Sequence, residues 1–148
     1  MNFGTAYTLS LAIGEMRAHA IDLLKTNELP VSDLTVDKDL FVVTDGGLVV
    51  GTAGLETFHD CGLLRSLSVR KNFRNKGLGK LMVTQLEEIA TRKGISHLYL
   101  LTTTAKEFFE NQGYITIERN DAPQPIQTTE EFSTLCAATA ILMKKELR

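Results

Sequence analysis

The sequence lacks the features that mark membrane proteins, metalloproteins and disulfide-stabilised domains. No apolar run approaches the roughly 20 residues of a membrane-spanning helix, and the N-terminus has no basic start before its apolar residues and no clear cleavage site. Two cysteines in 148 residues form no disulfide framework, so we interpret them as reduced thiols of a cytoplasmic protein. The three histidines show no metal-ligand spacing with these cysteines, so we expect no metal site.

Strong charge and flexible linkers are missing as well. The formal net charge is −2, which gives no reason to expect nucleic acid or another polyanion as a partner. No repeat and no tract rich in Pro, Gly or Ser divides the chain. The length and the 43% hydrophobic content are enough to bury a core. We therefore expect one globular domain over 1–148, with no nucleic-acid or membrane partner.

Hydrophobic periodicity predicts an α/β (α+β) fold with a mixed central β-sheet flanked by helices. Apolar residues at helical spacing predict a first helix over 13–26. Apolar stretches at 40–44, 48–58 and 63–69, separated by turn-forming residues, predict an antiparallel meander. A long amphipathic helix should begin at Leu78, and the strand after it should pair parallel to 63–69, because a helical crossover separates them. The other expected elements are strands at 6–11, 97–101, 114–118 and 137–145, a helical turn at 31–36, a helix at 104–112 and a capped short helix after 128.

The stretch at 63–79, LLRSLSVRKNFRNKGLG, carries the strongest functional signal. It reads as a strand, a turn and a glycine-punctuated loop that opens the long helix. Backbone N–H groups converge in such a loop, and the helix dipole adds partial positive charge, so the segment suits a bound anion. The alternative is an ordinary glycine-rich turn that caps a helix.

Two motifs together resemble a known family. Arg74, Gly77 and Gly79 follow the order Gln or Arg, two residues, Gly, one residue, Gly or Ala. The block at 105–114, AKEFFENQGY, has an alanine, an aromatic pair and a Gly-aromatic ending. Over about 40–118 these features resemble the GNAT superfamily of acyl-CoA-dependent N-acetyltransferases. The resemblance implies a GNAT-like sheet and acetyl-CoA (coenzyme A) as the cofactor.

The same resemblance implies where the cofactor binds. Loop amides would hold the pyrophosphate while Arg74 adds charge, and the end of the preceding strand would pair with the pantetheine arm like an added strand. Phe109 stands where many members place a tyrosine that faces the sulfur of coenzyme A. The implied cofactor residues are Leu67, Ser68, Val69, Arg74, Asn75, Lys76, Gly77, Leu78, Gly79, Lys80, Thr104 and Phe109.

A narrower likeness covers nearly the whole chain. The segments at 54–56, 63–67, 99–105 and 125–136 look like the small GNAT proteins associated with arsenic-resistance operons, although Ala137-Ala138 stands where a proline is expected. This likeness implies a small amine acceptor in arsenical or toxin detoxification. Two roles stay open for Cys136, a thiolate that binds arsenic and ordinary buried packing, and we favour packing.

Amine acetylation needs a group that removes the proton of the amine. Glu56 is the candidate base, acting through a water, and its alternatives are a solvated strand carboxylate or a pair with Arg65. The leaving thiolate also needs a proton, which Phe109 cannot supply. Solvent is one source, and hydroxyls from other residues are the local options: Tyr99, Tyr114, Thr103 and Thr104.

Arg65 lies in a strand that we expect to be central, where a buried arginine needs partners. It could bind a substrate carboxylate or an arsenical oxyanion, or pair with Glu56. Thr102 and Thr103, like Thr104, follow a parallel strand at the edge where sites gather in α/β sheets. They could bond to substrate or cofactor, or cap the following helix.

The leading hypothesis is therefore an N-acetyltransferase that moves acetyl from acetyl-CoA to a primary amine of a small molecule. A second hypothesis is a module that binds or senses acyl-CoA without turnover. A third is a protein or peptide acetyltransferase, with 119–127 as one wall of its groove. A homodimer formed through exposed sheet edges is also plausible.

Overall fold

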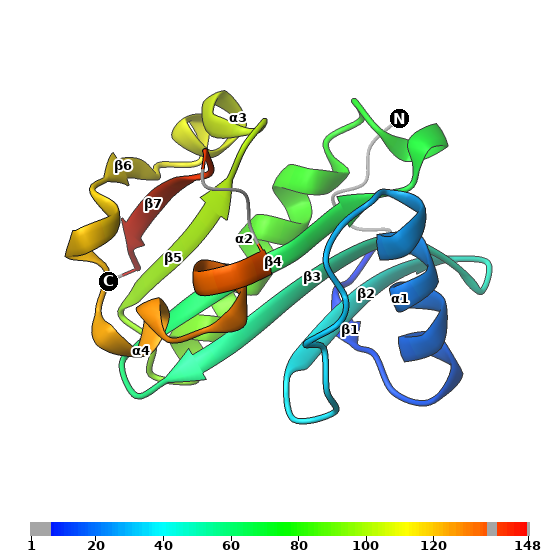
Figure 1. Ribbon diagram of the computed structural model, residues 1–148. Coiled ribbons are helices and arrows are strands. Elements are labelled where there is room, and N and C mark those ends of the chain that lie inside the picture. Colours follow the sequence, from blue (N-terminus) through cyan, green and yellow to red (C-terminus); the bar gives the residue numbers. More distant parts are fainter. Residues whose placement is uncertain (1–6, 136–138, 148) are drawn as a thin grey trace.

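A computed structural model of the chain describes residues 7–135 and 139–147. Its centre is a seven-stranded sheet in the order β1-β2-β3-β4-β5-β7-β6 (Figure 1). The parallel pairing of β4 with β5 is confirmed, and all the other neighbours are antiparallel. The strands are β1 (Ser10–Leu11), β2 (Asp39–Asp45), β3 (Leu48–Phe58), β4 (Cys61–Val69), β5 (His97–Thr102), β6 (Ile115–Ile117) and β7 (Ile141–Glu146).

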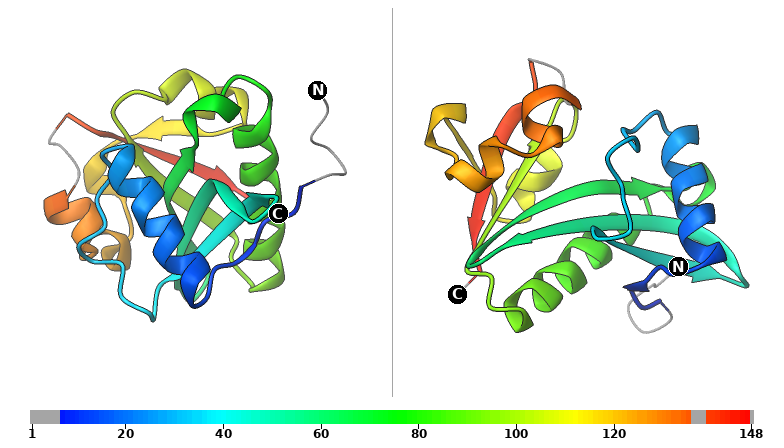
Figure 2. Two further views of the ribbon diagram at one scale, coloured as in Figure 1. Left: turned by 90° about the vertical axis from the view of Figure 1, so that its right-hand side faces the viewer. Right: turned by 60° about the horizontal axis from the view of Figure 1, so that its bottom comes forward.

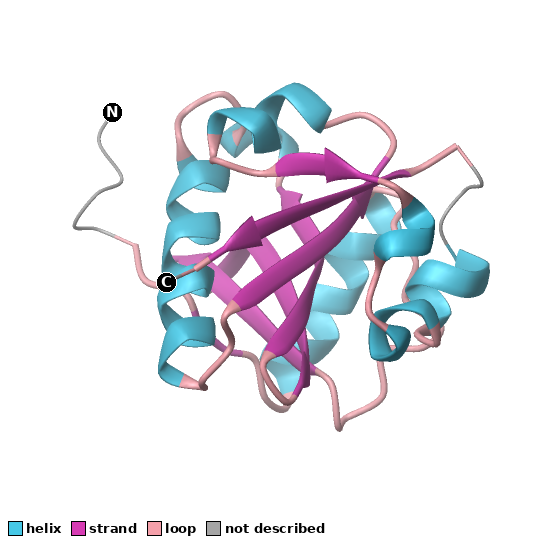
Figure 3. Ribbon diagram, turned by 90° about the vertical axis from the view of Figure 1, so that its left-hand side faces the viewer, coloured by secondary structure: helices cyan, strands magenta, loops and turns pink. Residues whose placement is uncertain are grey.

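Helices cover both faces of this sheet. The long helix α2 packs on one face, and α1 and α4 lie on the other (Figures 2 and 3). None of the helices within the described ranges is long and apolar enough to cross a membrane. The helices are α1 (Glu15–Thr26), α2 (Leu78–Arg92), α3 (Lys106–Asn111), α4 (Gln124–Gln127) and the π-helix η3 (Glu131–Leu135), with 3-10 turns at η1 (Lys71–Phe73) and η2 (Arg119–Asp121).

The predicted mixed fold is confirmed, and the differences concern the bounds of elements and two short helical segments. The first strand is limited to Ser10–Leu11. Residues 31–36 form turns rather than a helical turn. The expected capped helix after 128 is the π-helix η3, and the Thr129 hydroxyl accepts a hydrogen bond from the Phe132 amide at 3.1 Å. Local patterns specify where an element lies better than where it ends, because its last turn depends on tertiary contacts.

A bulge in β4 opens the sheet. The pairing of β3 with β4 shifts register between Thr52 and Gly54, and Ser66 adopts a left-handed conformation with φ 56°. On the other side, the pairing of β4 with β5 ends at Leu63 and Tyr99. Beyond that point the two strands diverge, so the edge of β4 that faces β5 is left for another partner.

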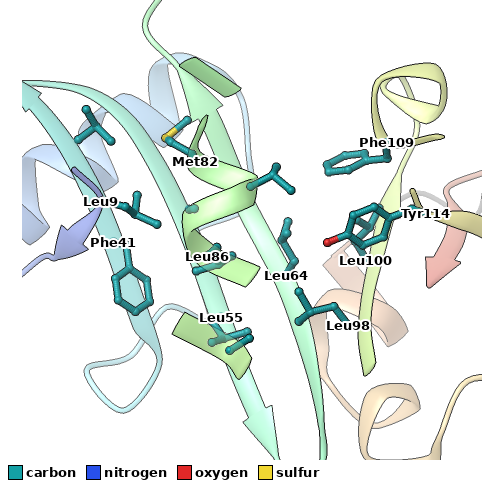
Figure 4. Packing of buried hydrophobic residues seen from close by; sticks show 14 of the residues in the cluster. Leu9, Phe41, Leu55, Leu64, Met82, Leu86, Leu98, Leu100, Phe109 and Tyr114 are labelled. Carbon is teal, nitrogen blue, oxygen red and sulfur yellow. The ribbon is translucent and has the colours of Figure 1, made fainter. Parts of the chain in front are cut away.

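The hydrophobic core lies in three clusters. The largest fills the space between the sheet and helices α2 and α3, with Leu64, Met82, Leu86 and Phe109 among its members (Figure 4). A second cluster packs α1 against β2 and β3. A third packs α4 against β4, β5 and β7. Arg65 lies on the same face of the sheet as the two smaller clusters. Its three ion-pair partners are Asp33, which follows α1, Glu131, which follows α4, and Glu56 of the neighbouring strand β3.

Candidate active site

Two adjoining cavities occupy the place where β4 and β5 diverge. The inner pocket has a volume of about 360 Å³ and lies between residues 64–67 of β4 and residues 100–104 at the end of β5. The loop groove has a volume of about 680 Å³ and runs over the glycine loop and the start of α2. Both are lined by Leu29, Leu67, Thr104 and Ala105, so the groove leads directly into the pocket.

The loop groove has the geometry of an anion site. Asn75 and Gly77 adopt left-handed conformations, with φ 64° and 87°, which turn the chain into α2. Within the described part of the chain, no side chain caps the start of α2, so its first-turn N–H groups lack the partner that most helices provide. Arg74 and Lys80 add positive charge to the lining. These groups fit the pyrophosphate of a bound coenzyme A.

The loop groove brings together nearly all of the predicted cofactor residues. Lys76 is exposed and lines neither cavity, and Phe109 lines the inner pocket instead. The predicted residues that line the loop groove are Leu67, Ser68, Val69, Arg74, Asn75, Gly77, Leu78, Gly79, Lys80 and Thr104.

Asn27 and Arg74 cross the end of β4. The Arg74 Nε donates to the Val69 carbonyl at 2.9 Å, and its Nη2 donates to the Asn27 Oδ1 at 3.0 Å. The Asn27 amide in turn donates to the Ser68 hydroxyl. Our reading of the sequence missed Asn27, because it follows the last turn of α1 and meets β4 only through the tertiary fold.

Phe109 forms part of the inner pocket and of the main core. It is buried, and its ring makes edge-to-face contacts with Phe108 and Tyr114, at centroid distances of 5.0 and 5.6 Å. A phenyl ring has no proton to donate, so Phe109 cannot act as the acid that a tyrosine would provide at this position. Phe109 is also a member of the main hydrophobic core.

The two tyrosines proposed as alternative acids lie elsewhere. Tyr114 donates its hydroxyl to Glu87 of α2 at 2.9 Å, and burial together with Glu87 raises its pKa. Burial also raises the pKa of Tyr99, which packs in the cluster under α4. No tyrosine is found among the described residues that line the two cavities, whereas Thr103 and Thr104 line the inner pocket.

Thr102 fits the alternative in which a threonine at this edge caps the helix that follows β5. Its hydroxyl accepts a hydrogen bond from the Ala105 amide at 3.0 Å, which orders the turn between β5 and α3. Thr102 also lines the inner pocket, as Thr103 does. The predicted binding of these two residues to substrate stays a prediction.

Arg65 lies at the centre of a buried ion-pair cluster. Its Nη1 contacts Asp33 at 2.5 Å and Glu56 at 2.9 Å, and its Nη2 contacts Asp33 at 2.8 Å and Glu131 at 3.2 Å. Its Nε donates to the Ser66 hydroxyl at 3.2 Å. Every guanidinium nitrogen therefore contacts a protein oxygen, and a substrate anion would bind Arg65 only by displacing one of them. Its predicted substrate role stays a prediction.

The electrostatics of the cluster favour the charged forms of Asp33 and Arg65. Burial favours the neutral form of Asp33, but hydrogen bonds from Arg65 and its positive charge outweigh burial and lower the pKa of this carboxyl. For Arg65, burial opposes the charged form, and the carboxylates of Asp33, Glu131 and Glu56 outweigh it and raise the pKa of the guanidinium. Asp33 and Arg65 therefore form an ion pair at neutral pH.

The predicted base and a residue that the prediction missed face different cavities. Glu56 pairs with Arg65, which was one of its stated alternatives, and lines a separate cavity beside Asp39 and Lys93. Glu131 reaches Arg65 from η3 and lines the inner pocket. The only sequence signal for Glu131 was its place in the 125–136 segment. The role of Glu56 as a base stays a prediction.

Cys61 is a free cysteine at the start of β4. Cys61 is buried, and burial followed by the charge of Asp60 raises the pKa of its thiol, as expected of a packed cysteine. Cys136 and the Ala137-Ala138 departure lie outside the described residues. Among the residues that the structure describes, no group of three or more His, Cys, Asp or Glu is arranged to hold a metal ion.

A family profile described as the acetyltransferase (GNAT) domain matches residues 37–116, more than half of the chain. The chain belongs to the GNAT acetyltransferase family. Acetyl-CoA is the cosubstrate of this family, and the loop groove and the inner pocket lie within or beside the matched region. The predicted GNAT membership is confirmed, whereas the arsenic-operon likeness remains a proposal.

This chain matches curated relatives over only part of the relatives' own length. An uncharacterised N-acetyltransferase of Chlorobaculum tepidum is 36% identical over 91 residues, which cover 60% of this chain and 57% of the relative. An amino-acid acetyltransferase of Aeromonas salmonicida is 29% identical over 93 residues, which cover 62% of this chain and 21% of the relative. The matches thus span little more than half of one relative and about a fifth of the other.

Solved structures share the GNAT fold. The N-acetylglutamate synthase of Neisseria gonorrhoeae, in complex with coenzyme A and N-acetyl-glutamate, superposes with a TM-score of 0.84 and 21% identity. The match covers 96% of this chain and 35% of the synthase chain. A Mycobacterium tuberculosis protein solved with coenzyme A gives a TM-score of 0.80 and 20% identity, covering 95% of this chain and 99% of that chain.

Proposed function

We propose that this GNAT domain transfers the acetyl group of acetyl-CoA to a primary amine of a small molecule. One observation carries the proposal: the groove over the glycine loop leads directly into the pocket where β4 and β5 diverge. A cofactor whose pyrophosphate is held by the loop would extend along the open edge of β4 toward this pocket. The acceptor amine would then meet the acetyl group inside it.

The residues that hold the cofactor follow from the groove. The amides at the start of α2 and the charge of Arg74 and Lys80 would bind the pyrophosphate, and the backbone of Leu67, Ser68 and Val69 would pair with the pantetheine arm. Acetyl-CoA supplies an activated acetyl thioester. The chain binds it, places the amine beside it and removes the proton of the amine. Since no described tyrosine lines the site, we propose that solvent supplies the proton of the leaving thiolate.

The size of the pocket favours a small acceptor. A volume of about 360 Å³ fits the range of small-molecule sites. A peptide substrate would instead need an extended surface groove, and 119–127 would be one wall of it. The finer proposal, that the acceptor is an amine-bearing arsenical or toxin, rests on the likeness at 125–136.

We also propose that the protein is located in the cytoplasm.

An unbiased amine screen tests the proposal. Purified chain is mixed with acetyl-CoA and a panel of small amines, amino-organoarsenicals and short peptides, and free thiol is measured. Release that depends on a small amine supports the proposal, and a preference for peptides favours the protein acetyltransferase. Coenzyme A binding without thiol release from any acceptor favours a sensing module.

A further inference from the structure

A buried carboxylate that sequence reasoning did not single out lines the inner pocket. Glu131 is only 6% exposed, and it shares the pocket lining with Arg65 and with Thr102–Thr104 at the end of β5. That lining adjoins the loop groove through Thr104 and Ala105. The carboxylate is therefore on the wall of the cavity in which the proposed function places the acceptor.

The fold holds Glu131 in place from both sides. Thr129 caps the start of η3 through its bond to the Phe132 amide at 3.1 Å. Arg119 donates to the Phe132 carbonyl at 3.1 Å and lies 4.9 Å from the centre of the Phe132 ring. The Glu131 Oε1 lies 3.2 Å from the Arg65 Nη2. A carboxylate fixed in this way needs little reorganisation to bind a ligand.

The charge around Glu131 suits a cation. The side chains of Asp33, Glu56 and Glu131 contact Arg65, and Lys38 lies 3.7 Å from Asp33. Three carboxylates against two cations leave a formal excess of one negative charge beside the pocket. A primary amine is mostly an ammonium ion at neutral pH, so the pocket attracts the acceptor in the form that must lose a proton before it can attack.

We propose that Glu131 binds the amino group of the acceptor and removes its proton, a role that rests on the proposed function. The ammonium passes one proton to the carboxylate, and the neutral nitrogen then forms a bond to the thioester carbonyl carbon. The carbon–sulfur bond breaks, and its electron pair leaves with sulfur. A second nitrogen proton passes through water to the thiolate, and Glu131 returns its own proton to solvent. Arg65 acts as a positioning residue that fixes the carboxylate.

The test compares Glu131→Gln with Glu130→Gln. Glutamine keeps an oxygen for Arg65 but cannot take a proton, so we expect kcat/KM for the amine to fall about 100-fold or more. The Kd for coenzyme A, measured by calorimetry, should stay at the wild-type value and shows that the variant is folded. Glu130 is exposed and lines neither cavity, so its variant should keep the wild-type rate.

A second readout separates proton removal from structural support. Each acceptor is compared with a β-fluorinated analogue, for example ethylamine with 2,2,2-trifluoroethylamine, whose amine is neutral at pH 7. The loss caused by Glu131→Gln should be at least about tenfold smaller for the fluorinated amine, because that amine arrives without the proton to be removed. A role in support alone predicts equal losses for both amines.

The outcomes are distinguishable. Wild-type rates in Glu131→Gln, or equal losses for both amines, overturn the role of Glu131 and leave the proposed function standing. No thiol release by the wild-type chain with any amine overturns the proposed function and this role together. A fall in kcat/KM in Glu56→Gln, together with a wild-type kcat/KM in Glu131→Gln, would overturn the role of Glu131 and assign the base role to Glu56.

Discussion

At the residue scale, Arg65 explains how one buried side chain joins distant parts of the chain. Asp33 lies 32 residues before it in sequence, and Glu131 belongs to the segment beyond α4. Both carboxylates meet the guanidinium in a region from which solvent is excluded, where an ion is tolerated only with partners. Arg65 thus stabilises the wall of the inner pocket by holding these distant segments together. This structural role does not depend on whether Arg65 also binds substrate.

Replacing Arg65 should destabilise the fold strongly. Arg65→Met removes the cation that three buried carboxylates share, and only Asp33 keeps a second one, Lys38. We therefore expect the free energy of unfolding to fall by about 3–5 kcal/mol, measured by urea denaturation. Lys93→Met is the matched control, because it breaks the exposed pair with Asp39 and should cost about 1 kcal/mol or less. Equal losses in the two variants would contradict the buried character of the cluster.

Asp33 should make the protein sensitive to acid. Its pKa is lowered in the folded chain, whereas an aspartate in the unfolded chain titrates near about 3.9. Stability from this ionised carboxyl is therefore present above about pH 4 and is lost as the pH falls through the lower folded value. Urea unfolding from pH 5 down to pH 2 should show this loss, and Asp33→Asn should flatten it. If the free energy of unfolding of Asp33→Asn fell with pH as steeply as that of the wild type, Asp33 would be excluded as a source of the acid sensitivity.

At the element scale, the loop before α2 combines two demands on the backbone. It must turn sharply enough to start a helix, and it must present the first-turn N–H groups to the groove. Gly77 meets both demands at φ 87°, a conformation that a residue with a Cβ adopts only at a cost. The α2 helix itself is anchored by its apolar face, so the loop is held on a rigid support.

Gly77→Ala should weaken cofactor binding. An alanine at φ 87° costs about 1–2 kcal/mol. The free loop can relax to avoid this cost, whereas the loop bound to coenzyme A must keep the left-handed conformation. We therefore expect the Kd for coenzyme A, measured by calorimetry, to rise about tenfold. Gly47→Ala introduces the same strain at φ 86° in the β2–β3 hairpin, where a Cβ has equal space. This control should lose stability but keep its affinity. Equal affinity in both variants would argue against the loop as the anion site.

At the scale of the whole molecule, the two cavities depend on a sheet that is joined at one end and open at the other. β4 and β5 pair only from Cys61 to Leu63, and the bulge at Ser66 bends β4 away. The main core lies beneath both strands and joins the two halves of the sheet. A cofactor seated in the opening would contact both halves and link them further.

Coenzyme A should therefore stabilise the whole domain. At a concentration 100 times its Kd, a ligand that binds only the folded chain adds about 2.7 kcal/mol to the free energy of unfolding. Thermal unfolding with and without coenzyme A measures this as a rise in Tm. Pantetheine, which lacks the pyrophosphate, is the matched control and should give a smaller rise. Equal shifts would mean that the loop contributes little.

The predicted homodimer concerns the outer edges of the sheet. The edge strands are β1 and β6, and Ile115 on β6 is 62% exposed. Pairing through such an edge would add backbone hydrogen bonds between subunits. Sedimentation velocity over a range of protein concentrations checks this prediction, and Ile115→Lys should shift the equilibrium toward monomer. A single species at monomer mass at every concentration would contradict it.

The sequence by itself determined the strand order through the meander, the parallel return of β5 and the loop before α2. The meander and the loop are local features, because side-chain periodicity and the left-handed preference of glycine act within a few residues. The parallel return of β5 follows from the helix that the sequence predicts between the two strands. Only the tertiary structure decided that Arg65 contacts three carboxylates and that Glu131, rather than Glu56, lines the inner pocket. Long-range ion pairs leave no local pattern, since their partners are chosen by how the sheet and helices pack.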